Sequence, residues 1–254
     1  MKKLRLLFAG FAVASCACLP AQLFAQIGPG FAPPSVISSA SGLTASVTTS
    51  GSYSILVSPQ GWTFSGAVGP VQNLEISVGT DAVGTWQQIS FNHATGRLSS
   101  IRLYDGQATA LFSTQYQQGG ANASPFPSFD TSPQTVIGFN YNGLWSYRFG
   151  GLNTRAPWVF FDPHANTFIL SPASNFMTAV GQFGANGALQ MPIDSRIATL
   201  PVNFTLTTLL SFGTGINATL NSWGETLTLL TGKSRVANDS SALHRNKRSR
   251  AGRP

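Results

Sequence analysis

The chain has 254 residues, of which 9% are charged and 43% are hydrophobic, and its formal net charge at pH 7 is +7. The positive charge belongs to the two ends, because between positions 26 and 232 five arginines face seven acids, a formal charge of −2. A nucleic-acid-binding domain needs basic residues gathered on a folded face, so this distribution argues against nucleic acid as a partner.

Residues 1–25 are predicted to be an export signal. Three positive charges in Met1–Arg5 precede an apolar run of 14 residues, Leu6–Leu19, which Pro20 ends. A bilayer span takes about 20 apolar residues, so this run is too short for a permanent membrane helix. We therefore expect cleavage after Ala25, no membrane span, and a secreted or periplasmic location.

A second processing route is open at Cys16. Val13–Cys16 resembles the lipobox of bacterial lipoproteins, in which the cysteine is lipidated and begins the mature chain. This route would anchor the protein in the cell envelope. Both cysteines, Cys16 and Cys18, lie within the signal. Ordinary cleavage therefore leaves no thiol for a disulfide, a metal site or a nucleophile.

Residues 26–42 are rich in Gly, Pro and Ser and are predicted to be a linker or the cover of a sheet edge. Beyond them, short segments rich in β-branched and aromatic residues alternate with turn-forming residues, which is typical of an all-β domain. The predicted strands are Leu43–Thr48, Tyr53–Ser58, Trp62–Val68, Val71–Ser77, Trp86–Phe91, Leu98–Tyr104, Ala108–Tyr116, Val136–Phe139, Leu144–Phe149, Trp158–Phe161, Thr167–Leu170, Met177–Phe183, Gly187–Met191 and Val202–Phe212.

These strands exceed the roughly ten that one strongly twisted open sheet carries. Two large antiparallel sheets packed face to face are the simplest arrangement, so residues 43–232 are predicted to form a large sandwich.

One amphipathic helix is predicted after the last strand. Its apolar residues are three or four positions apart and share one face, namely Ile216, Leu220, Trp223, Leu227 and Leu230. Asn217 and Thr214 are the candidates for its N-cap. The apolar stripe has two possible partners, the sandwich itself or a following domain.

Residues 233–254 are predicted to be a disordered basic tail. Among their arginines, serines and asparagines, only Val236 and Leu243 are sizeable apolar residues. Such a segment buries too little apolar surface to offset the entropy of ordering.

No pattern of catalytic residues is recognised between positions 26 and 232. His93 lies in a turn-like segment and is expected to be an exposed turn histidine. A glycosidase pair needs two of the seven acids close in space, but most of them, such as Asp81 and Asp105, lie where aspartate stabilises a backbone turn. We expect no catalytic residue, no metal and no cofactor.

Tryptophans are the candidates for sugar binding, because an exposed indole can stack on a sugar ring. Trp145 and Trp158 lie in apolar strands and Trp223 lies on the helix stripe, so core burial is the simpler interpretation for these three. For Trp86, at the start of a strand, the sequence does not decide between burial and exposure.

Several motifs together resemble the N-terminal β-supersandwich of secreted bacterial α-galactosidase-like glycoside hydrolases. They are Gly61–Gly66, Gly79–Trp86, Ser100–Tyr104, Ala156–Asp162 and Ser171–Phe176. In addition, the stretch from Ile193 through Asn217 to Gly224 is similar to the segment that leads from that sandwich into the catalytic barrel. The resemblance covers about residues 43–239.

In that family, the following (β/α)8 barrel carries the two catalytic carboxylates. The resemblance therefore implies a fold and a setting for this chain, without a catalytic residue. It implies that the sandwich braces the barrel and walls one side of a sugar pocket. Trp86 and Trp158, and the loop that holds Asp162 and His164, are the candidate carbohydrate contacts.

The resemblance also suggests an origin for the basic tail. A frameshift near Ala237–Ser241 would replace the start of the barrel with unrelated residues; the alternative is a genuine tail that touches acidic surface polymers. The functional prediction is an exported, non-catalytic sandwich related to hydrolases of α-galactoside-type sugars, in truncated form. A free-standing carbohydrate-binding module and a cell-envelope structural protein are the two alternatives.

Overall fold

The computed structural model describes residues 33–94, 96–121, 125–141, 147–149, 156–184 and 187–234. The predictions for the export signal, Cys16, Trp145 and most of the basic tail lie outside these residues. No helix within these ranges has the length and apolar character that crossing a membrane requires.

The described elements are strands followed by one helix. Their bounds are β1 (Ser35–Ser38), β2 (Leu43–Val47), β3 (Ser52–Val57), β4 (Trp62–Ala67), β5 (Val71–Thr80), β6 (Thr85–His93), β7 (Arg97–Tyr104), β8 (Thr109–Tyr116), β9 (Gly120–Ala121), β10 (Ser128–Phe129), β11 (Ile137–Tyr141), β12 (Tyr147–Phe149), β13 (Trp158–Phe161), β14 (Asn166–Pro172), β15 (Gln182–Phe183), β16 (Leu189–Gln190), β17 (Thr199–Leu200), β18 (Phe204–Thr214) and α1 (Ile216–Leu230).

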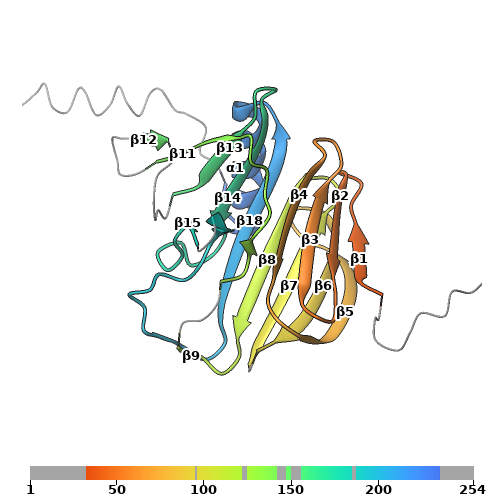
Figure 1. Cartoon of the computed structure of the whole chain (residues 1–254), viewed down its shortest axis with the longest axis vertical. Helices are drawn as coiled ribbons and strands as arrows, with labels where there is room; N and C mark the ends of the chain where they lie inside the picture. The colour runs from red at the N-terminus through yellow and green to blue at the C-terminus, as the bar shows by residue number, and fades with distance from the viewer. Residues whose placement is uncertain are drawn as a thin grey trace, which may run out of the picture. The chain divides into compact units, whose positions relative to one another are not determined.

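Two large antiparallel sheets pack face to face (Figure 1). The smaller has the order β1-β2-β3-β4, and the larger has the order β12-β11-β13-β14-β18-β8-β7-β6-β5. Two small sheets, β10-β16-β15 and β17-β9, complete the described fold. The predicted all-β, two-sheet sandwich is therefore confirmed.

Alternation of side chains along the strands sends one set inward and the other outward. In β7, Ile101 and Leu103 are fully buried in the core between the sheets, whereas Arg102 is half-buried on the outer face. In β2, Leu43, Ala45 and Val47 are all fully buried. A period of two is what a strand shows when one of its faces meets a core.

Aromatic rings join the two sheets. The ring of Phe64, on β4, lies 5.0 Å from that of Phe168 on β14, 5.5 Å from that of Phe212 on β18 and 5.4 Å from that of Phe129 on β10. The contacts with Phe168 and Phe129 are edge-to-face, a geometry in which each pair adds about 0.5–1.5 kcal/mol beyond area burial. Phe64 therefore ties both sheets and the small β10 sheet into one core.

Tyr53 adds the main polar link between the smaller sheet and β10. Its hydroxyl donates to the carbonyl oxygen of Ser128 at 2.6 Å and accepts from the Ser128 N–H at 2.8 Å. Gly66 faces this contact, where an added Cβ would lie 1.9 Å from the Ser128 carbonyl oxygen. Burial raises the pKa of Tyr53 well above its ordinary value, so the phenol keeps its proton and both bonds.

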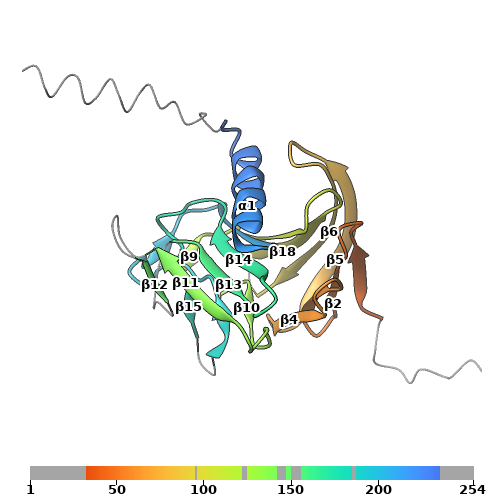
Figure 2. The ribbon, with the colours of Figure 1, turned by 90° about the horizontal axis from the view of Figure 1, so that it is seen from above.

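Helix α1 packs on the outer face of the larger sheet, opposite the side that faces β2 and β4 (Figure 2). Trp223, Leu227 and Leu230 meet a small cluster that includes Tyr104 and Leu209. The Trp223 indole N–H also donates to the hydroxyl of Ser171 on β14, at 2.8 Å. The predicted helix is confirmed, and its apolar stripe packs on the sandwich.

The predicted N-cap of this helix is wrong. Gly215, at φ 89°, occupies the N-cap position and offers no side-chain hydrogen bond. Thr214 still belongs to β18, where its hydroxyl donates to Asn166, and Asn217 already lies inside the first turn. A positive φ favours glycine, so the strand-to-helix turn is made at the residue between the two candidates.

Other differences from the predicted elements concern short strands. β1 lies within the residues expected to be a linker, because Ile37 packs into the core at 2% exposure and its neighbours pair with β2. The strand predicted at Met177–Phe183 shrinks to β15, since a turn closed by the Thr178 N–H and the Asn175 carbonyl occupies its start. The two-residue strands β9, β10 and β17 were not predicted.

Replacing Tyr53 with Phe is expected to lower the free energy of unfolding by about 1–3 kcal/mol, because both backbone groups of Ser128 lose a buried partner. Urea denaturation followed by tryptophan fluorescence measures the change. Tyr116→Phe is the matched control, since the Tyr116 hydroxyl takes part in none of the hydrogen bonds found among the described residues. Equal midpoints for the two variants would contradict the assignment of Tyr53 as a link.

Candidate functional site

The candidate sugar-binding residues lie in three separate settings. Trp158 is 2% exposed and belongs to the core, where its ring lies 5.0 Å from that of Phe183. Trp86 is partly buried and lies on the outer face of the larger sheet. Asp162 and His164 belong to the turn between β13 and β14. Each setting assigns a different role to its residues.

The carboxylate of Asp162 is engaged by its own turn. Its Oδ1 accepts from the N–H groups of His164 and Asn166, each at 2.9 Å, and its Oδ2 accepts from the Asn166 side chain at 2.9 Å. Partial loss of hydration would raise the pKa of Asp162, but the hydrogen bonds from Asn166 and His164 outweigh it and lower the pKa. Asp162 thus holds the turn in shape, while the His164 side chain is exposed.

Trp86 lies beneath an arginine on the outer face. The guanidinium carbon of Arg102 is 4.0 Å from the centre of the Trp86 ring, a cation–π contact. Gly79 leaves room for the indole, since a Cβ there would come within 2.4 Å of it. The guanidinium also donates to Asp81 at 2.8 Å and to Gln88 at 2.9 Å. The indole face is therefore covered by a side chain held by two further bonds.

A tyrosine completes this outer-face group. The Tyr104 hydroxyl donates to Asp81 Oδ2 at 2.9 Å. Burial raises the pKa of Tyr104 to about 12, so the phenol stays a donor at neutral pH. Asp81 also accepts from the Val83 N–H at 2.9 Å, which is the turn-stabilising role predicted for it. Asp81 is thus a structural acceptor with three donors.

Other acids have structural partners as well. Asp194 is 7% exposed and forms an ion pair with Arg196 at 2.6 Å, and the charge of Asp194 raises the pKa of that arginine. Asp105 accepts from the Ala40 N–H at 3.2 Å. Among the described residues, no three or more His, Cys, Asp or Glu side chains are grouped as a metal site would need.

The expectation that His93 is an exposed turn residue is wrong. It ends β6 and is 4% exposed, because the alternation that buries Phe91 also turns His93 inward. Its Nε2 lies 2.7 Å from the hydroxyl of Ser99, which lies 2.7 Å from that of Thr114. Ser99 is 1% exposed, so this pair is closed to substrate and serves the core.

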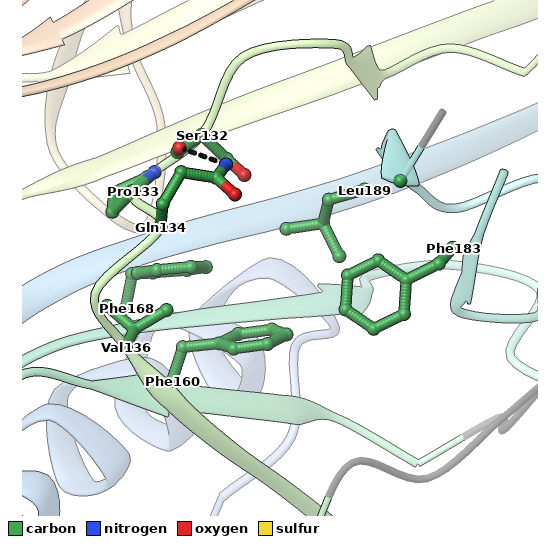
Figure 3. Close-up of a pocket in the computed structure, with 9 residues that line it drawn as sticks. Ser132, Pro133, Gln134, Val136, Phe160, Phe168, Phe183 and Leu189 are labelled. Atoms are coloured by element: carbon green, nitrogen blue, oxygen red, sulfur yellow. Dashed lines mark hydrogen bonds between the residues drawn. The ribbon is translucent and has the colours of Figure 1, made fainter. Parts of the chain in front are cut away.

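Two adjoining cavities lie at the β11 and β13 end of the larger sheet, on its inner side. Their volumes are about 210 and 160 Å³, and they share Val136, Phe160 and Phe183 as walls. Figure 3 shows the side chains of Phe160, Phe183 and Leu189 turned toward the smaller cavity. No charged side chain lines either cavity among the described residues.

The sequence flagged only Trp158 among the residues that line these cavities. The walls come from three stretches, 132–140, 158–168 and 183–189, which meet only through the tertiary fold. Aromatic residues in strands look alike in sequence whether they fill a core or line a cavity. The half-exposed Phe183, at 45%, is distinguished only by the structure.

No family model matches the sequence, and no curated protein matches it. Among solved structures, a glycoside hydrolase family 97 enzyme from Pseudoalteromonas sp. strain K8 overlays on the chain in its complex with panose and in its complex with acarbose. Each overlay has a TM-score of 0.50 and 10% identity, and covers 71% of this chain and 36% of the enzyme.

A ligand-free alpha-N-acetylgalactosaminidase, NagBb from Bifidobacterium bifidum, overlays with a TM-score of 0.45 and 6% identity over 76% of this chain and 38% of its own. The chain thus spans little more than a third of the length of these neighbours. At such low identity, the likeness to the family 97 enzyme is one of fold alone.

Stability is expected to fall between pH 6.5 and about 4 through His93. Burial, and to a lesser extent the nearby charge of Arg97, lowers the pKa of His93 from 6.5 to about 4. Between these pH values His93 is protonated in the unfolded chain and neutral in the folded chain. The contribution of neutral His93 to the free energy of unfolding is complete above pH 6.5 and is lost as pH falls toward 4. Urea midpoints at several pH values should show a smaller slope for His93→Gln than for wild type, and identical slopes would contradict the burial.

Proposed function

We propose that this chain is the non-catalytic β-sandwich module of an exported glycoside hydrolase, which braces a catalytic barrel domain. The overlay on the family 97 enzyme carries the proposal, because it matches 71% of this chain to 36% of that enzyme and leaves most of the enzyme without a counterpart. The motif resemblance points to the same kind of module. Fold likeness is a weaker warrant for function than the chemistry of a site.

Three of the seven acids between positions 26 and 232 support a non-catalytic role. A glycosidase needs one carboxyl as acid and a second as base or nucleophile, about 5 to 10 Å apart across the scissile bond. Asp81, Asp162 and Asp194 instead accept hydrogen bonds from their own turns and from neighbouring side chains. The carboxylate of each therefore serves to stabilise the fold.

An apolar patch at one end of the sandwich is the face that we assign to the barrel. We call it the end patch: Phe176, Met177 and Val202, which are 40%, 77% and 65% exposed. Phe176 and Met177 follow β14 and Val202 precedes β18, and the pairing of Pro172 with Thr208 places both segments at the same end of the larger sheet.

Hydrogen bonds fix the backbone of the end patch. The side chain of Asn175 donates to the carbonyl oxygen of Thr205 at 2.7 Å, and the Thr207 N–H donates to the Ser174 hydroxyl at 3.0 Å. Exposed apolar side chains on a rigid support are what a docking face between domains requires.

The finer proposals are the sugar and the location. The motifs favour α-galactoside-type sugars, and the panose complex of the overlaid enzyme adds panose as a second sugar to test. The proposed location is outside the cytoplasmic membrane. Mass spectrometry of the mature N-terminus separates its two routes, because a start at Gln26 supports a free protein and a lipidated Cys16 supports an envelope anchor.

Reading the locus beyond the codon for Val236 in all three frames tests the proposal. We expect one frame to encode several hundred residues of alternating strands and helices, the pattern of a barrel. Stop codons throughout the three frames, with no barrel gene beside the locus, would contradict the proposed module.

A barrel polypeptide from that reading allows the end patch to be tested by titration against the purified chain. Met177→Asp should weaken association at least about tenfold, because burying an unpaired charge costs more than about 1.4 kcal/mol. Val78→Asp is the matched control, since Val78 is 72% exposed on the edge strand β5, away from the end patch. Equal affinities for the two variants would contradict the assignment of this face.

A further inference from the structure

The two cavities beside Phe160 form a built site. None of their lining residues belongs to the four-stranded sheet, so they lie where the larger sheet is covered by the small β10-β16-β15 sheet. Neither the outer-face group at Arg102 nor the end patch contributes to them. Their function is therefore separate from the bracing of a barrel.

An aromatic wall runs along both cavities. The ring of Phe160 stacks on that of Phe168 at 4.7 Å and 16°, and its position across β11 requires Gly138, where a Cβ would lie 2.6 Å from the ring. The ring of Trp158 lies 5.8 Å from that of Phe160. Gly138 thus lies against the ring of Phe160, and Trp158, Phe160 and Phe168 are buried, at 2%, 7% and 1% exposure, so Phe183 supplies the exposed aromatic surface of the site.

Phe183 faces this wall and is held there by specific contacts. β15 pairs with β16 through Phe183 and Leu189, and the side chain of Gln182 donates to that of Gln190 at 3.2 Å. Gly184 accommodates Gln190, whose amide nitrogen would lie 1.6 Å from an added Cβ. A phenyl ring that is 45% exposed and fixed over an aromatic wall is placed for contact with a ligand.

Polar groups border both cavities. Asn140 lines the larger one at 1% exposure, and its Oδ1 has no hydrogen-bond partner among the described residues. A buried acceptor without a donor costs about 1–3 kcal/mol, which a ligand hydroxyl would offset. At the smaller cavity, Ser132 and the exposed amide of Gln134 form the polar side.

The volumes set the size of the ligand. An apolar cavity of about 150 Å³ holds one benzene-sized ring, so cavities of about 160 and 210 Å³ hold one six-membered ring each. The two cavities adjoin at Val136, Phe160 and Phe183, which line both.

We propose that these cavities bind a neutral sugar. A pyranose would present C–H groups to the ring of Phe183 and hydroxyls to Asn140 and Gln134, and an uncharged sugar suits a site with no charged side chain among its described lining residues. A purely aromatic ligand would leave Asn140 without a donor. The site needs no residue of a barrel, so it acts in the chain alone.

Titration of the full chain with melibiose, maltose and cellobiose, followed by tryptophan fluorescence and calorimetry, tests this proposal. At least one disaccharide should bind saturably and change the emission of Trp158, which lies in the aromatic wall. Phe183→Ala should weaken binding roughly tenfold, the equivalent of about 1.4 kcal/mol for a lost ring contact. Leu56→Ala, at an apolar residue of similar exposure on β3, outside both the site and the end patch, should bind as wild type does.

Three outcomes would overturn the proposal. The first is no saturation by any of the disaccharides up to roughly 10 mM, tenfold above a millimolar Kd. The second is equal binding by Phe183→Ala and wild type. The third is saturable binding of the apolar dye anilinonaphthalene sulfonate at this site without binding of any sugar. Circular dichroism of each variant shows whether the fold is kept, and none of these outcomes depends on a barrel partner.

Discussion

The edge-to-face contact between Phe64 and Phe168 joins the two sheets, and the rest of the structure depends on it. The described residues contain no cysteine, so no disulfide adds to this core. Phe168 also stacks on Phe160, which forms the wall of the proposed sugar site. One buried ring therefore links the stability of the sandwich to the shape of the smaller cavity, which it also lines.

Polarity is divided between the faces of the larger sheet. The inner face carries the core and keeps His93 neutral by burial, whereas the outer face carries Arg102, Asp81 and the helix α1. Charged groups on the outer face bind one another and cover Trp86. Hydrogen bonds and the cation–π contact on this face stabilise the sheet, and the exposed end patch is the surface proposed for the barrel.

Much of the fold could be predicted from the sequence, because β2, β3, β4, β6 and β7 alternate with period two, β13, β14 and β18 are rich in β-branched and aromatic residues, and α1 has a clear apolar stripe. β1, the Gly215 cap and the burial of His93 could not, since each depends on a neighbour distant in sequence or on a backbone angle. Of the residues that line the proposed sugar site, only Trp158 was predicted from the sequence. The other residues that line the site come from segments that only tertiary packing brings together. Asp162 and His164 lie elsewhere, in a turn whose backbone N–H groups donate to the Asp162 carboxylate.

The central claim is that this chain supplies a scaffold and that catalysis belongs to a barrel. The most direct measurement is the release of p-nitrophenol from the α-D-galactopyranoside and α-D-glucopyranoside by the purified chain, by the barrel polypeptide, and by the two together. The account predicts no release by the chain alone and release once the barrel is present. Turnover by the chain alone that is abolished by Asp162→Asn or Asp194→Asn would contradict it.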